Sequence, residues 1–249
     1  MAARPVGYPR QTSPAKTHRD NVPLPRNILG ALRPRHTSRL DRYRSSPQHT
    51  LPNQSAKAMV TTTAKLTPDE YRDREAIAEI RHEYRDGEIF EMPGGSIDHS
   101  SIITDLLLTL GLLLQDTDAN LYVSDMRLWI PACNVATYPD VTVVTGDPVL
   151  NGNRTDEILN PTLIAEVLSP STSGYDRGDK FAAYRTIPSF REYLLVRQDR
   201  PAIEHYWKID ENRWQLEEIH GLDAIAELHH LPAQLPLAKI YRRVQFEAG

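Results

Sequence analysis

The sequence predicts a mixed α/β domain in which a central sheet carries helices on its faces. Two short apolar runs, 139–144 and 163–168, have the composition of central strands covered on both sides. The segment 99–115 has the broad apolar face of a helix that covers a sheet. A helix near 175–186 and a strand at 191–197 follow along the chain.

The first folded elements are predicted from capping and turn residues. Folding is expected to begin at Thr67, which opens a capping box with proline at the first helical position. This helix is expected to run to about Ile80. The segment 82–92 has the pattern of a β-hairpin whose turn is Asp86 and Gly87.

The later elements follow from apolar periodicity. Asp98 is expected to cap the helix 99–115. The segment 121–130 alternates apolar and polar residues, as one strand would. Two antiparallel strands and a terminal helix are expected at 202–208, 212–219 and 236–244.

The composition is typical of a globular chain, and the length is enough for one sizeable core or two small ones. The 249 residues are 40% hydrophobic and 25% charged. The single cysteine, Cys133, excludes a disulfide framework and a thiolate metal site, and it suits a reducing cytoplasm. The longest apolar run, 106–114, is interrupted by Thr109 and Gly111 and fits a buried helix better than a membrane span. The N-terminus lacks the apolar segment of a secretory signal.

The first 58 residues differ in composition from the rest. They hold 11 Lys and Arg against 2 Asp and Glu, and eight of the 19 prolines, whereas the remainder holds 18 basic and 31 acidic residues. Such a segment is expected to be disordered. It could be a basic arm that binds nucleic-acid phosphates, or upstream sequence without a folded role if Met59 is the natural start. Composition favours the second interpretation, with a folded domain over 59–249.

Two acidic residues lie in the apolar strands. Asp140 is near the start of the run 139–144, and Glu166 is inside the run 163–168. Carboxylates in buried strands cost free energy unless a partner compensates them, and a divalent metal ion is the usual compensation. The alternatives are a strand-end cap for Asp140 and a structural salt bridge for Glu166.

A lysine follows the two strands on the predicted helix near 175–186. Asp176, Lys180 and Tyr184 are spaced for one helix face. In isolation, Lys180 could be the partner of Asp176 in an exposed pair worth about 0.3 kcal/mol. Its place after the two strand acids favours a role beside an attacking water or a phosphate. The acids and the lysine together indicate metal-dependent cleavage of a phosphodiester.

Other polar residues are weaker candidates. Glu83 could be a further metal ligand or a solvated hairpin residue, and His99 could line a pocket or serve the structure alone. His229 and His230 form a lone pair near a late strand and are expected at the surface rather than as ligands.

Short motifs are spread along the chain between residues 66 and 244. In order they are Arg81-His82-Glu83-Tyr84, Asp86-Gly87-Glu88, His99, Ser124-Asp125-Met126-Arg127, Tyr138-Pro139-Asp140-Val141, Glu166-Val167-Leu168-Ser169-Pro170-Ser171-Thr172, Asp176, Lys180, Tyr184 and Arg191-Glu192-Tyr193. This combined string resembles the Uma-two family, restriction-endonuclease-like proteins of the PD-(D/E)xK nuclease superfamily.

The resemblance implies a restriction-endonuclease-like fold and a set of roles. Asp140 matches the Asp of the motif, Glu166 its second acid, and Glu83 the early acid near the first helix. In the simplest superfamily pattern the lysine stands two residues after the second acid, where this chain has Leu168. Lys180 is then a lysine that has moved to the following helix.

The activity implied is Mg²⁺-dependent hydrolysis of phosphodiester bonds in DNA, with Mn²⁺ as a substitute. Asp140, Glu166 and the backbone carbonyl of Val167 are expected to hold the ion, with Glu83 assisting through a water or a second ion. Lys180 would orient the attacking water or offset phosphate charge. An enzyme that cuts both strands is expected to be a homodimer.

Three other classes of function are alternatives to this interpretation. One is a catalytically inactive module that keeps the nuclease fold and binds nucleic acid or a protein partner, because the acidic folded part has no evident basic stripe for duplex DNA. Unrelated hydrolases are disfavoured, since the sequence has no nucleophile elbow, zinc-protease helix, phosphate loop or dinucleotide fingerprint. A partner-binding role for the helix 99–115 is less favoured than a place in the core.

Overall fold

The computed structural model describes residues 65–92 and 94–246. Within them the chain has the mixed α/β class that the sequence predicts. The segment 1–58, expected to be a disordered basic extension, lies outside the described residues, as does the expected boundary at residue 59. None of the helices in the two described ranges combines the length and apolarity that a membrane crossing needs.

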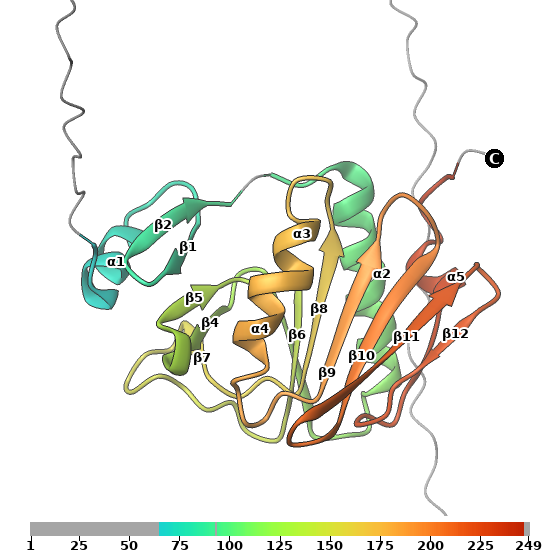
Figure 1. Ribbon diagram of the computed structural model, residues 1–249. Helices are drawn as coiled ribbons and strands as arrows, with labels where there is room; N and C mark the ends of the chain where they lie inside the picture. The colour runs from blue at the N-terminus through green and yellow to red at the C-terminus, as the bar shows by residue number, and fades with distance from the viewer. Residues whose placement is uncertain (1–64, 93, 247–249) are drawn as a thin grey trace, which may run out of the picture. The chain divides into compact units, whose positions relative to one another are not determined.

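A six-stranded mixed sheet forms the centre of the domain (Figure 1). Its strands are β3 (Ala119–Val123), β6 (Val141–Thr145), β8 (Leu163–Leu168), β9 (Glu192–Arg197), β10 (Ala202–Asp210) and β11 (Arg213–His220). The spatial order is β11-β10-β9-β8-β6-β3, in which β8 and β9 are parallel and the other neighbours antiparallel. All of β8 and all but the last residue of β6 are buried, as their apolar composition predicts.

Helix α2 (Ile97–Leu113) covers one face of this sheet and lies behind it in Figure 1. Its Ile102, Leu106 and Leu110 are fully buried in a core that they share with alternate strand residues. Burial of each such side chain contributes about 2 kcal/mol. The same core is completed by three short elements, β12 (Ile225–Glu227), β13 (Gln234–Pro236) and α5 (Leu237–Ile240).

A short helical segment covers the opposite face, in front of the sheet in Figure 1. It consists of α3 (Ser173–Tyr175), a π turn η2 (Asp176–Lys180) and α4 (Phe181–Tyr184). Phe181 stacks on Tyr193 of β9, with ring centroids 5.1 Å apart. Inserted π turns are rare and occur often at functional sites, so this one draws attention to the residues that it carries.

A second, five-stranded sheet was not expected from the sequence. Its elements are α1 (Pro68–Glu75), β1 (His82–Arg85), β2 (Glu88–Glu91), β4 (Arg127–Ile130), the 3₁₀ turn η1 (Pro131–Cys133), β5 (Val135–Thr137) and β7 (Glu157–Ile158). The strands follow the order β2-β1-β5-β4-β7, and α1 and η1 flank them. All five strands have only two to four residues, too few for a periodic signal.

The capping and turn predictions at the start of the domain are confirmed. The Thr67 hydroxyl accepts the Glu70 backbone N–H while the Glu70 carboxylate accepts the Thr67 N–H, which is the predicted capping box. β1 and β2 form the predicted antiparallel hairpin. Asp86 and Gly87 occupy its turn at φ values of 44° and 97°, a left-handed conformation that an Asp-Gly pair accepts.

Helix α1 ends at Glu75, not near Ile80 as predicted. Ile77 and Ile80 are 86% and 53% exposed, so the apolar residues that favour a longer helix have nothing to pack against. The Glu75 carboxylate instead accepts the backbone N–H of His82, which ties the end of the helix to β1.

Three later boundaries also differ from the predictions. Ser96 caps α2 through the His99 N–H, and Asp98 lies in the first turn rather than at the cap. The segment 121–130 is two strands, because a turn after β3 sends β4 into the second sheet. The terminal helix expected over 236–244 is a single turn, α5.

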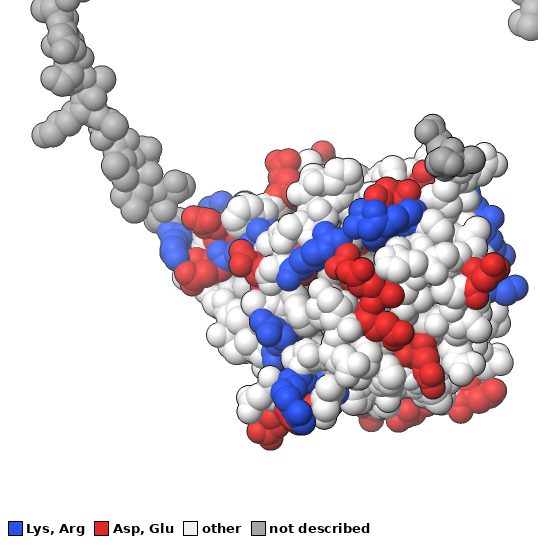
Figure 2. Space-filling view, turned by 45° about the vertical axis from the view of Figure 1, so that its right-hand side comes forward, with Lys and Arg blue, Asp and Glu red and all other residues white. Residues whose placement is uncertain are grey.

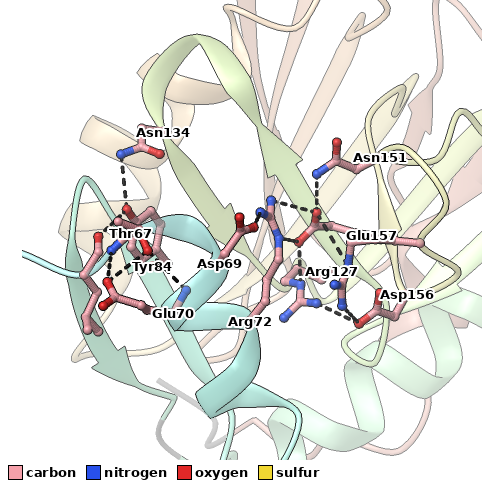
Figure 3. Close-up of polar contacts among 12 residues, drawn as sticks. Thr67, Asp69, Glu70, Arg72, Tyr84, Arg127, Asn134, Asn151, Asp156 and Glu157 are labelled. Carbon is pink, nitrogen blue, oxygen red and sulfur yellow. Dashed lines mark hydrogen bonds and ion pairs between the residues drawn. The ribbon is translucent and has the colours of Figure 1, made fainter.

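A buried ion-pair network joins the second sheet to α1 (Figure 3). Glu157 of β7 is fully buried and accepts hydrogen bonds from Nε and Nη2 of Arg72 at 3.2 and 3.1 Å. Arg127 of β4 places its Nε 2.9 Å from the same carboxylate. Glu157 is therefore the buried group that compensates both guanidinium groups, while Asp69 and Asp156 contact them from more exposed positions.

Glu157→Ala is expected to lower the free energy of unfolding by about 3 kcal/mol, because it leaves the buried Arg127 guanidinium undercompensated. Urea denaturation of residues 1–249 measures the change. Asp69→Ala removes an exposed partner of Arg72 and should change stability by less than about 0.5 kcal/mol. Equal unfolding midpoints for the two variants would contradict a stabilising role for the network.

Candidate active site

A cavity of about 690 Å³ collects the acidic residues and the lysine singled out in the sequence. Its polar lining comes from β1, α2, the start of β6, β8 and η2. The residues that matter for the chemistry are Glu83, His99, Asp140, Glu166, Asp176 and Lys180. Segments that are almost 100 residues apart in the chain therefore contribute to one surface.

The pairing of β6 with β8 brings the two strand acids together. Val141 is the cross-strand partner of Ala165, so Asp140, just before β6, lies beside Glu166. The Asp140 carboxylate accepts the Val167 backbone N–H at 2.8 Å. The Asp140 N–H in turn lies 3.4 Å from Oε2 of Glu166. Asp140 thus does more than end a strand, since its side chain faces the same cavity as Glu166.

Lys180 lies at the centre of the carboxylates. Its Nζ is 2.9 Å from Glu166, 3.2 Å from Glu83 and 3.6 Å from Asp176. Its side chain is only 8% exposed, so the pair with Asp176 is not the exposed surface pair that the sequence left open. The π turn carries both residues of that pair, one at each end.

Glu83 is held by several donors. Its Oε1 accepts the Thr137 hydroxyl as well as the Lys180 ammonium, and its Oε2 accepts Nη2 of Arg85 at 2.7 Å. Burial alone would raise the pKa of Glu83, but the charge of Lys180 and these hydrogen bonds outweigh burial and lower it. Glu83 is therefore an ionised group that holds Lys180 and Arg85 in place.

The pKa of Glu166 is shifted in the opposite direction from that of Glu83. Burial, with the nearby charges of Asp140 and Asp176, raises the pKa of Glu166 to about 8 in spite of Lys180. Burial would lower the pKa of Lys180, but the surrounding carboxylates outweigh it and raise that pKa well above its usual value. One ammonium thus serves more carboxylates than it can neutralise, and the cluster favours a further positive charge.

His99 completes the cluster from the first turn of α2. Its Nε2 lies 3.4 Å from Oδ2 of Asp140. Burial would lower the pKa of His99, but the hydrogen bond to Asp140 and the charge of that carboxylate raise it. His99 is thus a pocket residue, one of the two possibilities that the sequence left open.

A family model described as "Putative restriction endonuclease" matches residues 68–238. The chain belongs to the Uma2 family. It is 41% identical over 169 residues to "Uncharacterized protein sll1609" of Synechocystis sp., which covers 68% of this chain and 96% of that relative. It is 37% identical over 182 residues to "Uncharacterized protein slr1290" of the same organism, covering 73% and 94% of the two chains.

A solved structure has the same fold. It is described as "a putative nuclease belonging to DUF820 from Anabaena variabilis ATCC 29413". The TM-score is 0.58 at 18% identity, over 71% of this chain and 98% of that chain. The predicted Uma2 membership and the restriction-endonuclease-like fold are confirmed. The family identifies a nuclease-like protein, and restriction-endonuclease-like families generally depend on divalent metal ions.

The cavity of this Uma2 protein has donors that suit a hard divalent cation. Asp140 and Glu166 offer carboxylate oxygens from adjacent strands, and such ions bind oxygen in preference to nitrogen or sulfur. Asp140 contacts Val167 and His99 through Oδ2, so Oδ1 is the oxygen left for another partner. Val167 also lines the cavity. The carboxylate surplus around Lys180 fits the charge of the ion.

One contact and one residue of the site were not predicted from the sequence. Tyr184, expected on the same helix face as Lys180, donates its hydroxyl to Oε1 of Glu166 at 2.7 Å, a contact that was not predicted. Arg85 was not identified. The Arg85 guanidinium lies 3.6 Å from the Tyr175 ring centroid. Arg85 stands two residues after Glu83 on one strand, and that spacing alone would have placed both side chains on the same face.

The stability of the metal-free protein should depend on pH through the protonation of Glu166. The pKa of Glu166 is about 8 in the folded protein and near 4.5 when exposed, so the folded state keeps a proton that the unfolded chain has released. The free energy of unfolding of the metal-free protein is expected to fall by up to about 1.4 kcal/mol per pH unit between these two values. Urea unfolding in chelator across this window measures the slope.

Glu166→Gln should remove most of that slope. A weaker slope of the same sign remains from His99, whose pKa is also raised. Wild-type stability that stays level or rises with pH over this window would contradict a protonated Glu166.

Proposed function

We propose that this Uma2 protein is a Mg²⁺-dependent endonuclease that hydrolyses phosphodiester bonds in DNA, with Mn²⁺ as a substitute. The observation that carries the proposal is the meeting of Asp140, Glu166 and Lys180 in one cavity. In this proposal Asp140, Glu166 and the backbone carbonyl of Val167 hold the ion. When bound, Mg²⁺ lowers the pKa of a water ligand and stabilises charge that develops on the phosphate.

Lys180 has the contacts of a group that acts on the attacking water or the phosphate. Its ammonium is held by Glu166 and Glu83, so it can donate a hydrogen bond without first adopting a new position. The water oxygen forms the new bond to phosphorus and releases a proton to solvent. The bond to the leaving oxygen breaks, and that oxygen takes up a proton from solvent.

We propose that Glu83 assists the ion through a water or a second ion, and that it also acts through its neighbours. It contacts both Lys180 and Arg85, so it positions two cationic groups at once. Arg85 lies between the rings of Tyr175 and Phe90, with its guanidinium carbon 3.6 and 4.2 Å from their centroids. A guanidinium held in this way can pair with a phosphate through two hydrogen bonds.

The mixed surface charge of the folded part restricts which groups could contact the phosphates of duplex DNA. Figure 2 shows Lys and Arg interspersed with Asp and Glu on the face that it presents. Phosphate contacts would then come from local groups such as Arg85 or from the segment 1–58 with its 11 basic residues. We further propose a cytoplasmic homodimer, in which two cavities cut the two strands.

Asp140→Ala and Glu166→Ala are each expected to reduce Mg²⁺-dependent cleavage by at least about 100-fold, because each removes a proposed ligand. Supercoiled plasmid and single- and double-stranded oligonucleotides, with and without Mg²⁺ or Mn²⁺, serve as substrates. Asp210→Ala removes an exposed acid on β10 and should leave cleavage unchanged. Full activity in either cavity variant would contradict the assignment.

Mg²⁺ binding is expected in the wild type and absent in the Asp140→Ala/Glu166→Ala double variant. Isothermal titration calorimetry without nucleic acid measures it, and circular dichroism checks that the variant is folded. Metal binding without cleavage of any substrate would favour the inactive nucleic-acid-binding module. Equal Mg²⁺ affinity in both proteins would exclude the two acids as ligands.

A further inference from the structure

A second group of metal-ligating side chains lies on the central sheet. It consists of His205 on β10, Glu217 on β11 and His229 between β12 and β13, and one ligand atom from each lies within 4.8 Å of the others. None of the three lines the acidic cavity. His205 points to the same face of its strand as Ile203, which belongs to the core beneath α2. Glu166 points to the same face of its strand as Ile164, which belongs to the core beneath α4. The two groups are therefore on opposite faces of the sheet.

Strand register and ring stacking assemble this group. His205 and Glu217 are direct cross-strand partners in the β10–β11 pair, which places their side chains side by side. His229 reaches them from a different hairpin. Its ring lies over Trp207, with centroids 4.0 Å apart, and 5.6 Å from the ring of His205. Trp207 is two residues beyond His205 and so holds His229 on the same strand face.

His205 has a nitrogen that nothing in the described chain satisfies. The residue is fully buried, and its Nε2 lies 2.9 Å from Oε2 of the equally buried Glu192. Its Nδ1 is buried and has no hydrogen-bond partner among the described residues. A buried polar atom without a partner destabilises the folded state, so this nitrogen calls for an explanation. A metal ion bound to Nδ1 would give this atom the partner that it lacks.

Glu192 supports this site in two ways. When its Oε2 accepts a hydrogen bond from the Nε2–H of His205, the lone pair of that imidazole tautomer is on Nδ1, the arrangement in which histidine binds metal. Its Oε1 accepts the backbone N–H of His230, which fixes the segment that carries His229. One buried carboxylate thus orients one proposed ligand and anchors the chain beside another.

We infer that His205, Glu217 and His229 bind a transition-metal ion of the zinc class. Two imidazoles and one carboxylate are the donors that Zn²⁺ accepts, whereas Mg²⁺ prefers oxygen donors alone. The ion would fasten the β10–β11 hairpin to the β12–β13 hairpin, with a fourth position open to water or to a further ligand. This site is independent of the proposed nuclease chemistry. It gives His229 a role beyond the surface position expected from the sequence.

Zinc titration of the untagged full-length protein tests the inference. Excess Mg²⁺ is present throughout, so that the acidic cavity does not compete for zinc. His229→Ala and Glu217→Gln alter exposed residues and should fold, which circular dichroism checks. Each is expected to weaken zinc binding by at least about tenfold, by analogy with the loss seen when a group supporting a metal site is removed.

Two control variants separate this site from other zinc-binding groups. His220→Ala removes an exposed histidine of β11 that pairs with Glu218 and should retain wild-type zinc affinity. The Asp140→Ala/Glu166→Ala variant should also retain it, so failure of the nuclease proposal would not affect this result. Co²⁺ in place of Zn²⁺ should give visible absorption bands that disappear in His229→Ala. Undiminished zinc binding by His229→Ala, or no zinc binding by the wild type, would overturn the inference.

Discussion

The excess of buried carboxylates around Lys180 is the constraint on which the site and its surroundings depend. Charges in a protein interior interact strongly and are costly to leave unpaired. Lys180 contacts three acids, and Arg85, Thr137 and Tyr184 supply further donors, but the raised pKa of Glu166 shows that compensation is incomplete. A fold selected for stability alone would have replaced one of these acids, since apolar residues in place of buried ion pairs are often neutral or stabilising. The proposed Mg²⁺ ion would account for their presence together.

The scaffold holds these charges on buried, well-packed elements. Asp140 and Glu166 belong to central strands with apolar residues on both sides, and the antiparallel register sets their separation. Lys180 ends a π turn whose helical segment is packed through Phe181 against β9. Functional groups on such elements are positioned more accurately than groups on loops. Glu83 comes from the other sheet, so the stability of that sheet, through its Glu157 network, also affects the site.

How much the sequence predicts depends on whether a signal is local. The apolar run 163–168 matches β8 residue for residue, and the Thr67 capping box and the Asp86-Gly87 turn are found where predicted, because each is encoded in a few adjacent residues. The second sheet was missed because its short strands are defined by long-range pairing. The split of 121–130 was missed for a related reason, since β3 and β4 alternate as one strand would although they belong to different sheets. The His205 group was missed because cross-strand neighbours and stacked rings leave no pattern along the chain, whereas the two-residue spacing of Glu83 and Arg85 on one strand was a signal that could have been used.

The two proposed sites use one sheet in different ways. Glu166 on β8 and Glu192 on β9 belong to neighbouring strands, but the first faces a cavity of oxygen donors and the second supports a nitrogen-rich group. Donor type, rather than affinity alone, decides which ion a protein site selects. The carboxylate oxygens of Asp140 and Glu166 favour a hard ion such as Mg²⁺, whereas two imidazoles favour zinc even where magnesium is abundant. Because the donors differ in kind, the two proposed sites would take different ions, and the structural and chemical roles of the two ions could be tested separately.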